Sequence, residues 1–368
     1  MEKYQICTRC VMDNSSDDSI VFDQNGFCNY CSEQLAKKES RYFPNERGEK
    51  ILQQKISEIK EAGKGKKYDC LMGISGGLDS SYLAYLGAAR WGLRILAVHI
   101  DDGFDTEISQ KNIKRLVEKC NFDYHVIKPN AKQYGALTVE YMKAGVPNLA
   151  IPQDNILFAE IYKYARKEKI GYFLSGHNFA LECVLQRGNT YDAYDVKNIK
   201  DINRRYGNTD ISELNFISNF KYDLYKRILG IKTVQLLNYI DYNRERALKE
   251  LKEYCGFEYY GSKHLENTLT KFIQLYWFPK RFAVDKRKSH YSSMIVSGQM
   301  TREEALRLLE QPIYDEADME QTINEILEEF GLSKNEFEKI MASPNHQHTE
   351  FKTSWYRKIK VWLHSKKK

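Results

Sequence analysis

The sequence predicts an α/β protein with a central, doubly wound parallel sheet, a small metal-binding segment at the N-terminus and a helical C-terminal region. Short apolar segments alternate with helical patterns between residues 69 and 175, which favours a parallel sheet covered on both faces. Two Cys-x-x-Cys pairs near the N-terminus indicate the metal site. We expect four parts, at residues 1–45, 46–255 with an insertion at 185–232, 256–350, and a basic aromatic tail at 351–368.

The elements follow in order along the chain. A charged helix is expected at residues 46–62. The apolar runs predict strands at 69–74, 94–100, 124–127 and 172–175. The intervening periodic segments predict helices at 80–91, 110–120, 131–144 and 155–168. A capping box at Thr301 and later apolar periodicity predict C-terminal helices at 302–309, 319–330 and 334–341.

The bulk composition argues for a globular cytosolic protein. Of 368 residues, 42% are hydrophobic, which is ample for a core, and no run of about 18 apolar residues predicts a membrane span. No apolar leader is seen, so the eight cysteines are expected to stay reduced. The net charge is +6, but the tail alone holds seven Lys/Arg and no acid, which leaves residues 1–350 at −1. A nearly neutral body disfavours binding of a large RNA.

Four cysteines predict a structural zinc site in a ribbon or knuckle, namely Cys7, Cys10, Cys28 and Cys31. Between the pairs, residues 20–27 resemble a small hairpin with an Asn-Gly turn. Two disulfides are the alternative, which a reducing compartment disfavours. The remaining thiols are expected to be core residues rather than nucleophiles: Cys70, Cys120, Cys183 and Cys255.

The segment from residue 70 to residue 86 is the most informative in the chain. A buried strand ends at Ile74, a polar glycine-rich turn follows, and a helical pattern begins, which together predict an anion-binding helix N-terminus. Its candidate ligand-binding residues are Ser75, Gly76, Gly77, Asp79, Ser80 and Ser81. The lysine of a Walker A loop is absent.

The pattern Ser-Gly-Gly-Leu-Asp-Ser at residues 75–80 resembles the PP-loop of the N-type ATP pyrophosphatases, which have a HUP-like sheet. This resemblance implies that the loop cradles the β- and γ-phosphates of ATP, that ATP is cleaved to AMP and pyrophosphate, and that an oxygen of the substrate is adenylated. It also implies Mg²⁺ held with the help of Asp79.

Two further strand ends are expected beside the nucleotide, because ligands of parallel sheets bind beyond the carboxyl ends of the strands. The resemblance implies adenine contacts at the end of the second strand, at His99 and Asp101, and nucleotide contacts in a second loop, at Gly176 and Asn178. Simple placement at a strand end is the alternative for the histidines. Glu182 is balanced between a role near the sugar or metal and an ordinary helix carboxylate.

Three blocks together resemble the bacterial N-acetyl-sugar amidotransferases of surface-glycan and LPS O-antigen biosynthesis. They are residues 7–13, residues 73–81, and residues 278–290 followed by 297–305. The resemblance implies an ATP-dependent, AMP-forming ligase that converts an acetamido group into an acetamidino group through an O-adenylyl imidate. Such chemistry needs positioning and charge neutralisation more than a protein nucleophile. Catalytic candidates are Asp79 and the cations Lys280, Arg281, Lys286 and Arg287, for which a solvated basic face is the alternative.

No glutaminase signature is visible, so ammonia is expected from a separate partner. The resemblance implies a glutaminase and barrel-synthase pair resembling the histidine-pathway amidotransferase. The tail could touch the inner membrane surface weakly, although a solvated or partner-docking tail is favoured. The alternative function is a tRNA-modifying PP-loop enzyme of the thiolation or lysidine type, and a third is a nucleotide-sensing module. The acceptor is expected to be a free or nucleotide-linked N-acetyl sugar, with no nucleic-acid partner.

Overall fold

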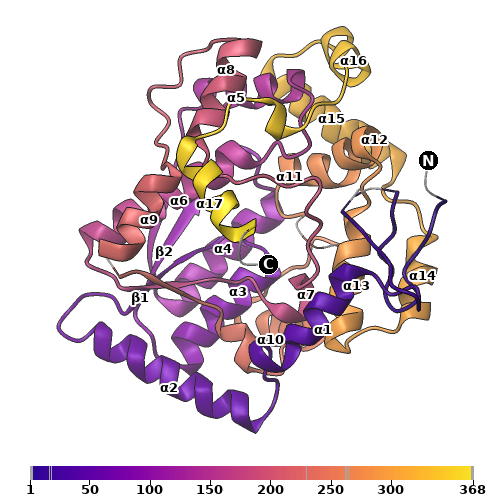
Figure 1. The fold of residues 1–368 in the computed structure, drawn as a ribbon. Coiled ribbons are helices and arrows are strands. Elements are labelled where there is room, and N and C mark those ends of the chain that lie inside the picture. Colours follow the sequence, from indigo (N-terminus) through magenta and orange to yellow (C-terminus); the bar gives the residue numbers. More distant parts are fainter. Residues whose placement is uncertain are drawn as a thin grey trace.

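A five-stranded parallel sheet forms the centre of the molecule, in the strand order β3-β2-β1-β4-β5 (Figure 1). The strands are β1 (Cys70–Gly73), β2 (Ile95–Ile100), β3 (Asp123–Ile127), β4 (Tyr172–Leu174) and β5 (Lys232–Val234). The computed structural model describes residues 3–365 except 16, 18, 229, 262 and 264. The predicted fold class and the four predicted strands are confirmed. The fifth strand is missed by the sequence because two of its three residues are exposed and only the last is half-buried, whereas the equally short β4 is mostly buried and apolar.

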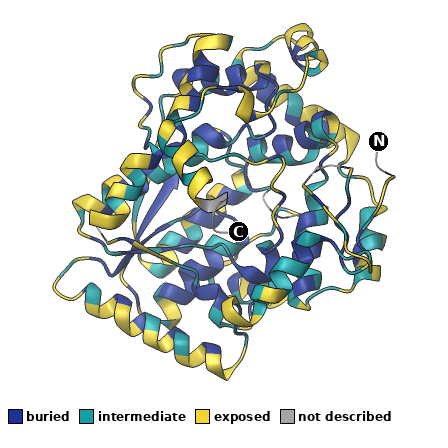
Figure 2. Cartoon of the chain, in the orientation of Figure 1, coloured by how far each residue is buried: buried dark blue, intermediate teal, exposed yellow. Residues whose placement is uncertain are grey.

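Alternate residues of the central strands bury against opposite layers, which is what a doubly wound sheet requires. Met72 of β1 packs with helices on one face, whereas its neighbour Leu71 packs with α6 and the segment before β5 on the other. The helices of the first face are α2 (Glu46–Ala62), α3 (Leu78–Tyr85), α4 (Glu107–Cys120) and α10 (Arg244–Cys255). The second face is covered by α6 (Ile151–Lys167) and α9 (Asn219–Ile228). Figure 2 shows buried strands inside exposed outer helix faces.

The C-terminal region is helical and builds a second apolar core with α5 (Ala131–Lys143) and α8 (Val196–Tyr206). Its helices are α11 (Thr268–Phe272), α12 (Phe278–Phe282), α13 (Lys286–Ser297), α14 (Arg302–Leu309), α15 (Glu316–Phe330) and α16 (Lys334–Ala342). Short π- and 3₁₀-turns lie at Leu86–Arg90, Leu236–Tyr239, Ile273–Trp277 and His348–Glu350. The fully buried Trp277 anchors this core and donates its indole N–H to the carbonyl of Val146 at 3.0 Å.

The N-terminal segment docks on the C-terminal helices α13 and α14 rather than standing alone (Figure 1). The N–H of Val11 donates to Ser292 of α13 at 3.2 Å, and Arg302 of α14 donates to the carbonyl of Cys7 at 2.9 Å. The predicted hairpin is present, with a Phe22–Cys28 antiparallel bridge. Helix α1 (Asn29–Arg41) follows directly.

The basic aromatic tail folds back on the molecule as helix α17 (Trp355–Ser365). Tyr356 and Lys360 both bind the carboxylate of Asp223 in α9, at 2.9 Å each. Three of the seven cations counted in the tail, at residues 366–368, lie outside the described residues. Within the described chain, no helix combines the length and the apolar character that crossing a membrane demands.

Candidate active site

The glycine-rich turn joins the carboxyl end of β1 to the N-terminus of α3, where it was expected. Gly77 caps α3 and offers no side-chain hydrogen bond, so the first-turn N–H groups have no capping side chain from that residue. Gly76 has a φ of 75°, and a Cβ there would lie 2.7 Å from the carbonyl oxygen of Ser109. The turn therefore needs glycine for its conformation and for packing on α4, and it ends at a helix N-terminus, the kind of position that favours anions.

A cavity of about 440 Å³ opens in front of this turn. Its floor is the turn itself with Ser75, Gly77, Asp79 and Ser80, and Gly176 of the second loop lies beside them. Its acidic and basic wall groups are Asp79, Asp154, His177, Glu182, Arg244, Lys263 and Glu266. The position, at the carboxyl ends of β1 and β4, is the one at which parallel sheets bind ligands.

A chain of charged side chains runs through the cavity. The ammonium of Lys263 lies 2.8 Å from Asp79 and 3.0 Å from Glu182, and the other oxygen of Glu182 lies 2.8 Å from Nδ1 of His177. Burial opposes the charge of Lys263, but the two carboxylates outweigh burial and raise its pKa. Tyr242 donates to the same oxygen of Asp79 as Asn178 does. Asp79 is thus held in one orientation, with a cation beside it.

A second acidic side chain, Glu266, lies against the turn. Ser75 donates to Oε1 of Glu266 at 3.2 Å, and a Cβ on Gly77 would lie 2.4 Å from that oxygen. Oε2 is buried and has no hydrogen-bond partner among the described residues. Burial raises the pKa of Asp154 to about 6. Carboxylate oxygens around an anion site form the donor set that Mg²⁺ prefers, so the cavity could hold this ion together with phosphates.

An adjoining cavity of about 440 Å³ extends over the ends of β1, β2 and β4. It is lined by His99 and by apolar side chains such as Leu157 and Phe173, which suit a flat aromatic base. His99 binds the carbonyl of Ile74 at 2.8 Å and Asp105 at 2.6 Å. Burial disfavours a charge on this imidazole, yet Asp105 raises its pKa overall. The two cavities share one wall, because five residues line both of them: Ser75, Asp154, Leu157, Gly176 and Glu266.

Four predicted ligand-binding residues do not line either cavity. Gly76 packs against α4, and Ser81 is fully buried in α3. Asp101 forms a salt bridge with Lys128 at 2.8 Å. Asn178 is fully buried, and it caps α7 (Phe179–Glu182) while donating to Asp79 at 3.2 Å, so it positions the site from behind.

The four cations predicted from residues 280–287 are placed apart from one another. The guanidinium of Arg281 holds the C-terminal end of α16 in place. It donates hydrogen bonds to Asn345 and to the carbonyl oxygens of Ile340, Ser343 and Pro344.

The other three cations also lie outside the cavity wall. Arg287 pairs with Asp285 at 2.8 Å, and Lys280 lies over the ring of Tyr276. Lys286 lies over the ring of Phe278. Burial lowers the pKa of Lys286, and the charge of Glu182, which lines the cavity, partly offsets this effect.

Sequence reasoning missed the cations that do line the cavity, Lys263 and Arg244, together with Glu266. Lys263 and Glu266 lie in the irregular segment between α10 and α11, where no helical or strand period marks a side chain as inward-facing. Their only signal is a lysine and a glutamate three residues apart in a loop, which is too common to single out.

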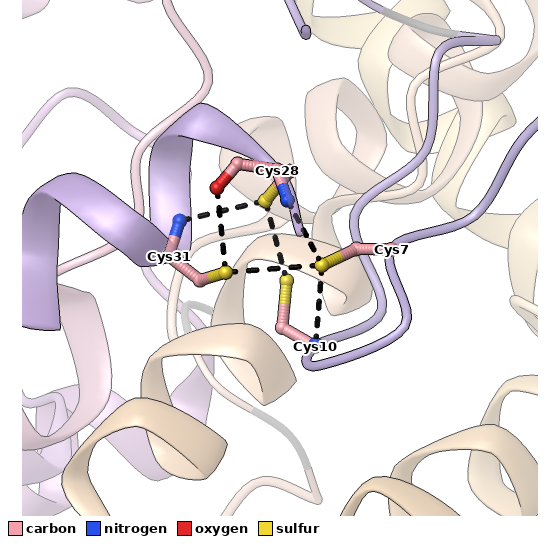
Figure 3. A group of neighbouring side chains, drawn as sticks. All are labelled: Cys7, Cys10, Cys28 and Cys31. Carbon is pink, nitrogen blue, oxygen red and sulfur yellow. Dashed lines mark hydrogen bonds between the residues drawn. The ribbon is translucent and has the colours of Figure 1, made fainter. Parts of the chain in front are cut away.

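The four N-terminal cysteines converge on one point and could hold a metal ion (Figure 3). The sulfurs of Cys7 and Cys31 lie 3.7 Å apart, and those of Cys10 and Cys28 lie 3.5 Å apart. Four thiolates at the zinc–sulfur bond length would be about 3.8 Å from one another, so this spacing fits tetrahedral zinc. Hydrogen bonds from the other three cysteines and from the N–H of Cys10 lower the pKa of Cys7.

One known protein family resembles part of this chain. Residues 266–362 match the family model described as LPS biosynthesis protein WbpG-like, C-terminal domain. Over this segment the resemblance to surface-glycan biosynthesis proteins is confirmed. No curated protein sequence matches the chain.

Three solved structures show remote similarity. The NMN synthetase from Francisella tularensis is 13% identical, with 63% of this chain and 93% of that chain covered at a TM-score of 0.29. The NH3-dependent NAD synthetase from Campylobacter jejuni is 16% identical, with 56% and 93% covered at a TM-score of 0.29. The U34-tRNA thiolase NcsA from Methanococcus maripaludis is 17% identical, with 84% and 90% covered at a TM-score of 0.34. These values are too low to carry over any residue or activity.

Proposed function

We propose, from the family match of the C-terminal segment and the site beside it, that this chain is an ATP-dependent amidotransferase of surface-glycan biosynthesis. It converts an acetamido group of an N-acetyl sugar into an acetamidino group. The amide oxygen attacks the α-phosphorus of ATP, which releases pyrophosphate and leaves an O-adenylyl imidate. Ammonia then adds to the imidate carbon, and AMP departs.

The observation that carries this proposal is the N-terminus of α3, which faces a cavity with Lys263 but has no Walker lysine. Its N-cap residue Gly77 supplies no side-chain acceptor, and Tyr260 accepts only from the N–H of Leu78. The backbone N–H groups and the helix dipole would hold the pyrophosphate portion of ATP. Lys263 would meet its growing negative charge, and the adjoining cavity at His99 would take the adenine. Mg²⁺, held by Asp79 and neighbouring carboxylates, would add further charge neutralisation.

His177 is the side chain best placed to manage a proton in this scheme. Its Nδ1 is held by Glu182 at 2.8 Å, so Nε2 is left to face the reacting groups. A histidine oriented by a carboxylate is a common general base. We propose that it accepts the proton that ammonia loses on addition to the imidate.

The test is product analysis with the full chain, ATP, Mg²⁺, ammonium and an N-acetyl sugar. AMP and pyrophosphate are expected in equal amounts, and the sugar product should be about one mass unit lighter, because oxygen is replaced by NH. ADP as the sole nucleotide product would overturn the proposal. Turnover that depends on tRNA instead of a sugar would favour the alternative, a tRNA-modifying PP-loop enzyme.

Ammonia is proposed to come from a separate glutaminase, delivered by a partner pair resembling the histidine-pathway glutaminase and its barrel synthase. A glutaminase of the cysteine type needs a reactive thiolate. Burial raises the pKa of Cys183 to about 12 and that of Cys120 to about 11, and it also raises those of Cys70 and Cys255. The four thiols outside the N-terminal cluster are therefore poor nucleophiles.

We propose a cytoplasmic location with peripheral contact to the inner membrane surface through α17 and α9. Trp355 is 64% exposed and Phe220 of α9 is 55% exposed, and both helices carry an excess of Lys and Arg. Exposed aromatic and basic side chains together favour anionic lipid surfaces. Co-sedimentation with phosphatidylglycerol vesicles, lost in Trp355→Ser and absent with phosphatidylcholine, would support this contact. Equal recovery with both lipids would contradict it.

A further inference from the structure

A further cavity of about 470 Å³ lies next to the ATP cavity, and His177 and Glu182 line both. We infer that this outer cavity binds the acceptor as an N-acetylated sugar that carries an anionic group, and that the metal-binding N-terminal segment builds its walls. The inference rests on the proposed function and adds to it the place and the charge of the acceptor. An acceptor bound here, with its acetamido group toward His177, would reach the edge of the ATP cavity.

The walls of the outer cavity have the chemistry that recognises a sugar. Side-chain amides and a hydroxyl surround it, from Gln34, Thr190, Gln235 and Asn238. Asn238 is already engaged, since its Oδ1 accepts from the N–H of Phe179 at 2.7 Å and its amide donates to Gln235. Gln34 makes no hydrogen bond within the described part of the chain, so both of its polar groups can meet sugar hydroxyls. Leu185 is apolar yet 48% exposed beside them, which suits the methyl group of an acetamide.

Two arginines on the wall indicate that the acceptor is anionic. Arg187 pairs with Glu33, whereas Arg41 has no carboxylate partner in the described ranges. An arginine without a carboxylate at the rim of a polar cavity is suited to bidentate binding of a carboxylate or a phosphate. The anionic group is therefore the carboxylate of a sugar acid or the diphosphate of a nucleotide carrier.

The N-terminal segment organises both walls. Helix α1 begins at Asn29, directly after Cys28, and Cys31 lies in its first turn, so a metal bound by these cysteines would set the direction of the helix. Gln34 lies three residues beyond Cys31, and Arg41 is the last residue of the same helix.

The opposite wall is tied to the same segment. The N–H of Arg187 donates to the hydroxyl of Tyr30 at 2.8 Å and to Asp17 at 3.1 Å, and Gly188 also donates to Asp17. Tyr30 itself donates to Asp17 at 2.5 Å. The cysteine segment thus holds the loop at 187–188 against α1, which gives the metal site a role in acceptor binding as well as in folding.

The experiment compares Arg41→Ala and Gln34→Ala with two matched controls on α2, Arg47→Ala and Gln54→Ala. Steady-state kinetics of the full chain are measured against ATP and against each acceptor. The acceptor KM is expected to rise at least tenfold in the two cavity variants, with the KM for ATP changed less than twofold. The controls should match wild type. Unchanged acceptor KM in both cavity variants, or an equal rise for ATP, would overturn the inference.

Three acceptor probes locate the anionic group: a nucleoside-diphosphate N-acetyl sugar, an N-acetylated uronic acid without a nucleotide, and neutral N-acetylglucosamine. The probe whose KM responds most to Arg41→Ala identifies the source of the charge. An equal response to the neutral sugar would overturn the assignment of an anionic acceptor. Saturation-transfer NMR provides a readout that does not need turnover. Loss of acceptor binding in Arg41→Ala would support the acceptor cavity even if no amidine forms. Amidine formation with wild-type acceptor KM in both cavity variants would contradict the acceptor cavity but leave the proposed function intact.

Discussion

At the scale of single residues, Lys263 is the cation on which we propose that the site depends, since it contacts both Asp79 and Glu182 with 17% of its side chain exposed. Lys263→Met is expected to lower kcat/KM for ATP by about 10²–10³, the usual loss when a charge-stabilising donor is removed. The measurement is pyrophosphate release with ammonium and an N-acetyl sugar.

Lys271→Met is the matched control for this substitution, because Lys271 is equally exposed and pairs with Asp318 at 2.6 Å. It should keep turnover within threefold of wild type. If Lys263→Met also stays within threefold, the phosphate charge is met elsewhere, and Lys286, which is close to Glu182, becomes the next residue to test.

His348 is predicted to make the fold sensitive to mild acid. It is 2% exposed and stacked on Tyr191, and burial, aided by the charge of Arg357, lowers its pKa to about 3. In the unfolded chain this imidazole is protonated below about pH 6.5, whereas in the folded chain it stays neutral down to about pH 3. The free energy of unfolding therefore falls as the pH drops from about 6.5 toward 3. Between pH 7 and pH 5 this histidine should cost about 2 kcal/mol of unfolding free energy.

Urea unfolding at both pH values checks this prediction. His348→Phe keeps a ring to stack on Tyr191 and should remove about 2 kcal/mol of the acid loss. His125→Phe, which replaces another histidine stacked on a tyrosine, serves as the control and should retain the wild-type dependence. An unchanged pH dependence in His348→Phe would show that other groups govern the acid sensitivity.

At the scale of elements, the N-terminal cysteine segment is expected to need its metal. Cys28→Ser should lose one zinc per chain and lower solubility, because such a small segment has little core of its own. The thermal midpoint should also fall, since Arg302 and Ser292 bind the backbone of this segment. Metal analysis of freshly purified protein checks the stoichiometry. Clearly less than one zinc in wild type, or unchanged zinc in Cys28→Ser, would contradict the assignment.

The end of helix α16 provides the test that separates a structural cation from a catalytic one. Arg281 is 8% exposed and donates to three backbone carbonyl oxygens and to Asn345. Arg281→Met should reduce the free energy of unfolding by about 3 kcal/mol, because buried acceptors lose their donors. Turnover well below the melting temperature should persist. Denaturant unfolding measures the loss, with the exposed Arg47→Met as the control, and wild-type stability with lost turnover would reverse the assignment.

At the scale of the whole molecule, the purified chain should use free ammonium but not glutamine. The described thiols outside the cysteine cluster have raised pKa values, so the chain offers no evident glutaminase nucleophile. Amidine formation with ammonium should rise with pH in the mildly alkaline range as more ammonia is present. Glutamine should support turnover only after a glutaminase partner is added. Turnover with glutamine alone would reveal an overlooked active site.

Features that depend on a short stretch of sequence could be predicted from the sequence alone. Strands β1 to β4, most helices, the glycine-rich turn and the four-cysteine group are each encoded within about 30 neighbouring residues. Periodicity, glycine placement and cysteine spacing act locally, so they can be read without knowing the fold. The short strand β5 and the basic residues at 280–287 lack such local signals of their role.

The sequence by itself determined the type of sheet, the location of the glycine-rich turn at the end of β1 and the identity of the four cysteines that converge near the N-terminus. Only the tertiary structure decided which charges surround the turn. Lys263 reaches Asp79 across 184 positions of the chain, and Glu266 reaches Ser75 across 191. Contacts of this kind depend on how α10, α11 and the loop between them pack over the sheet. The same packing directs Arg281 into the C-terminal core, although its sequence neighbourhood resembles that of a catalytic cation.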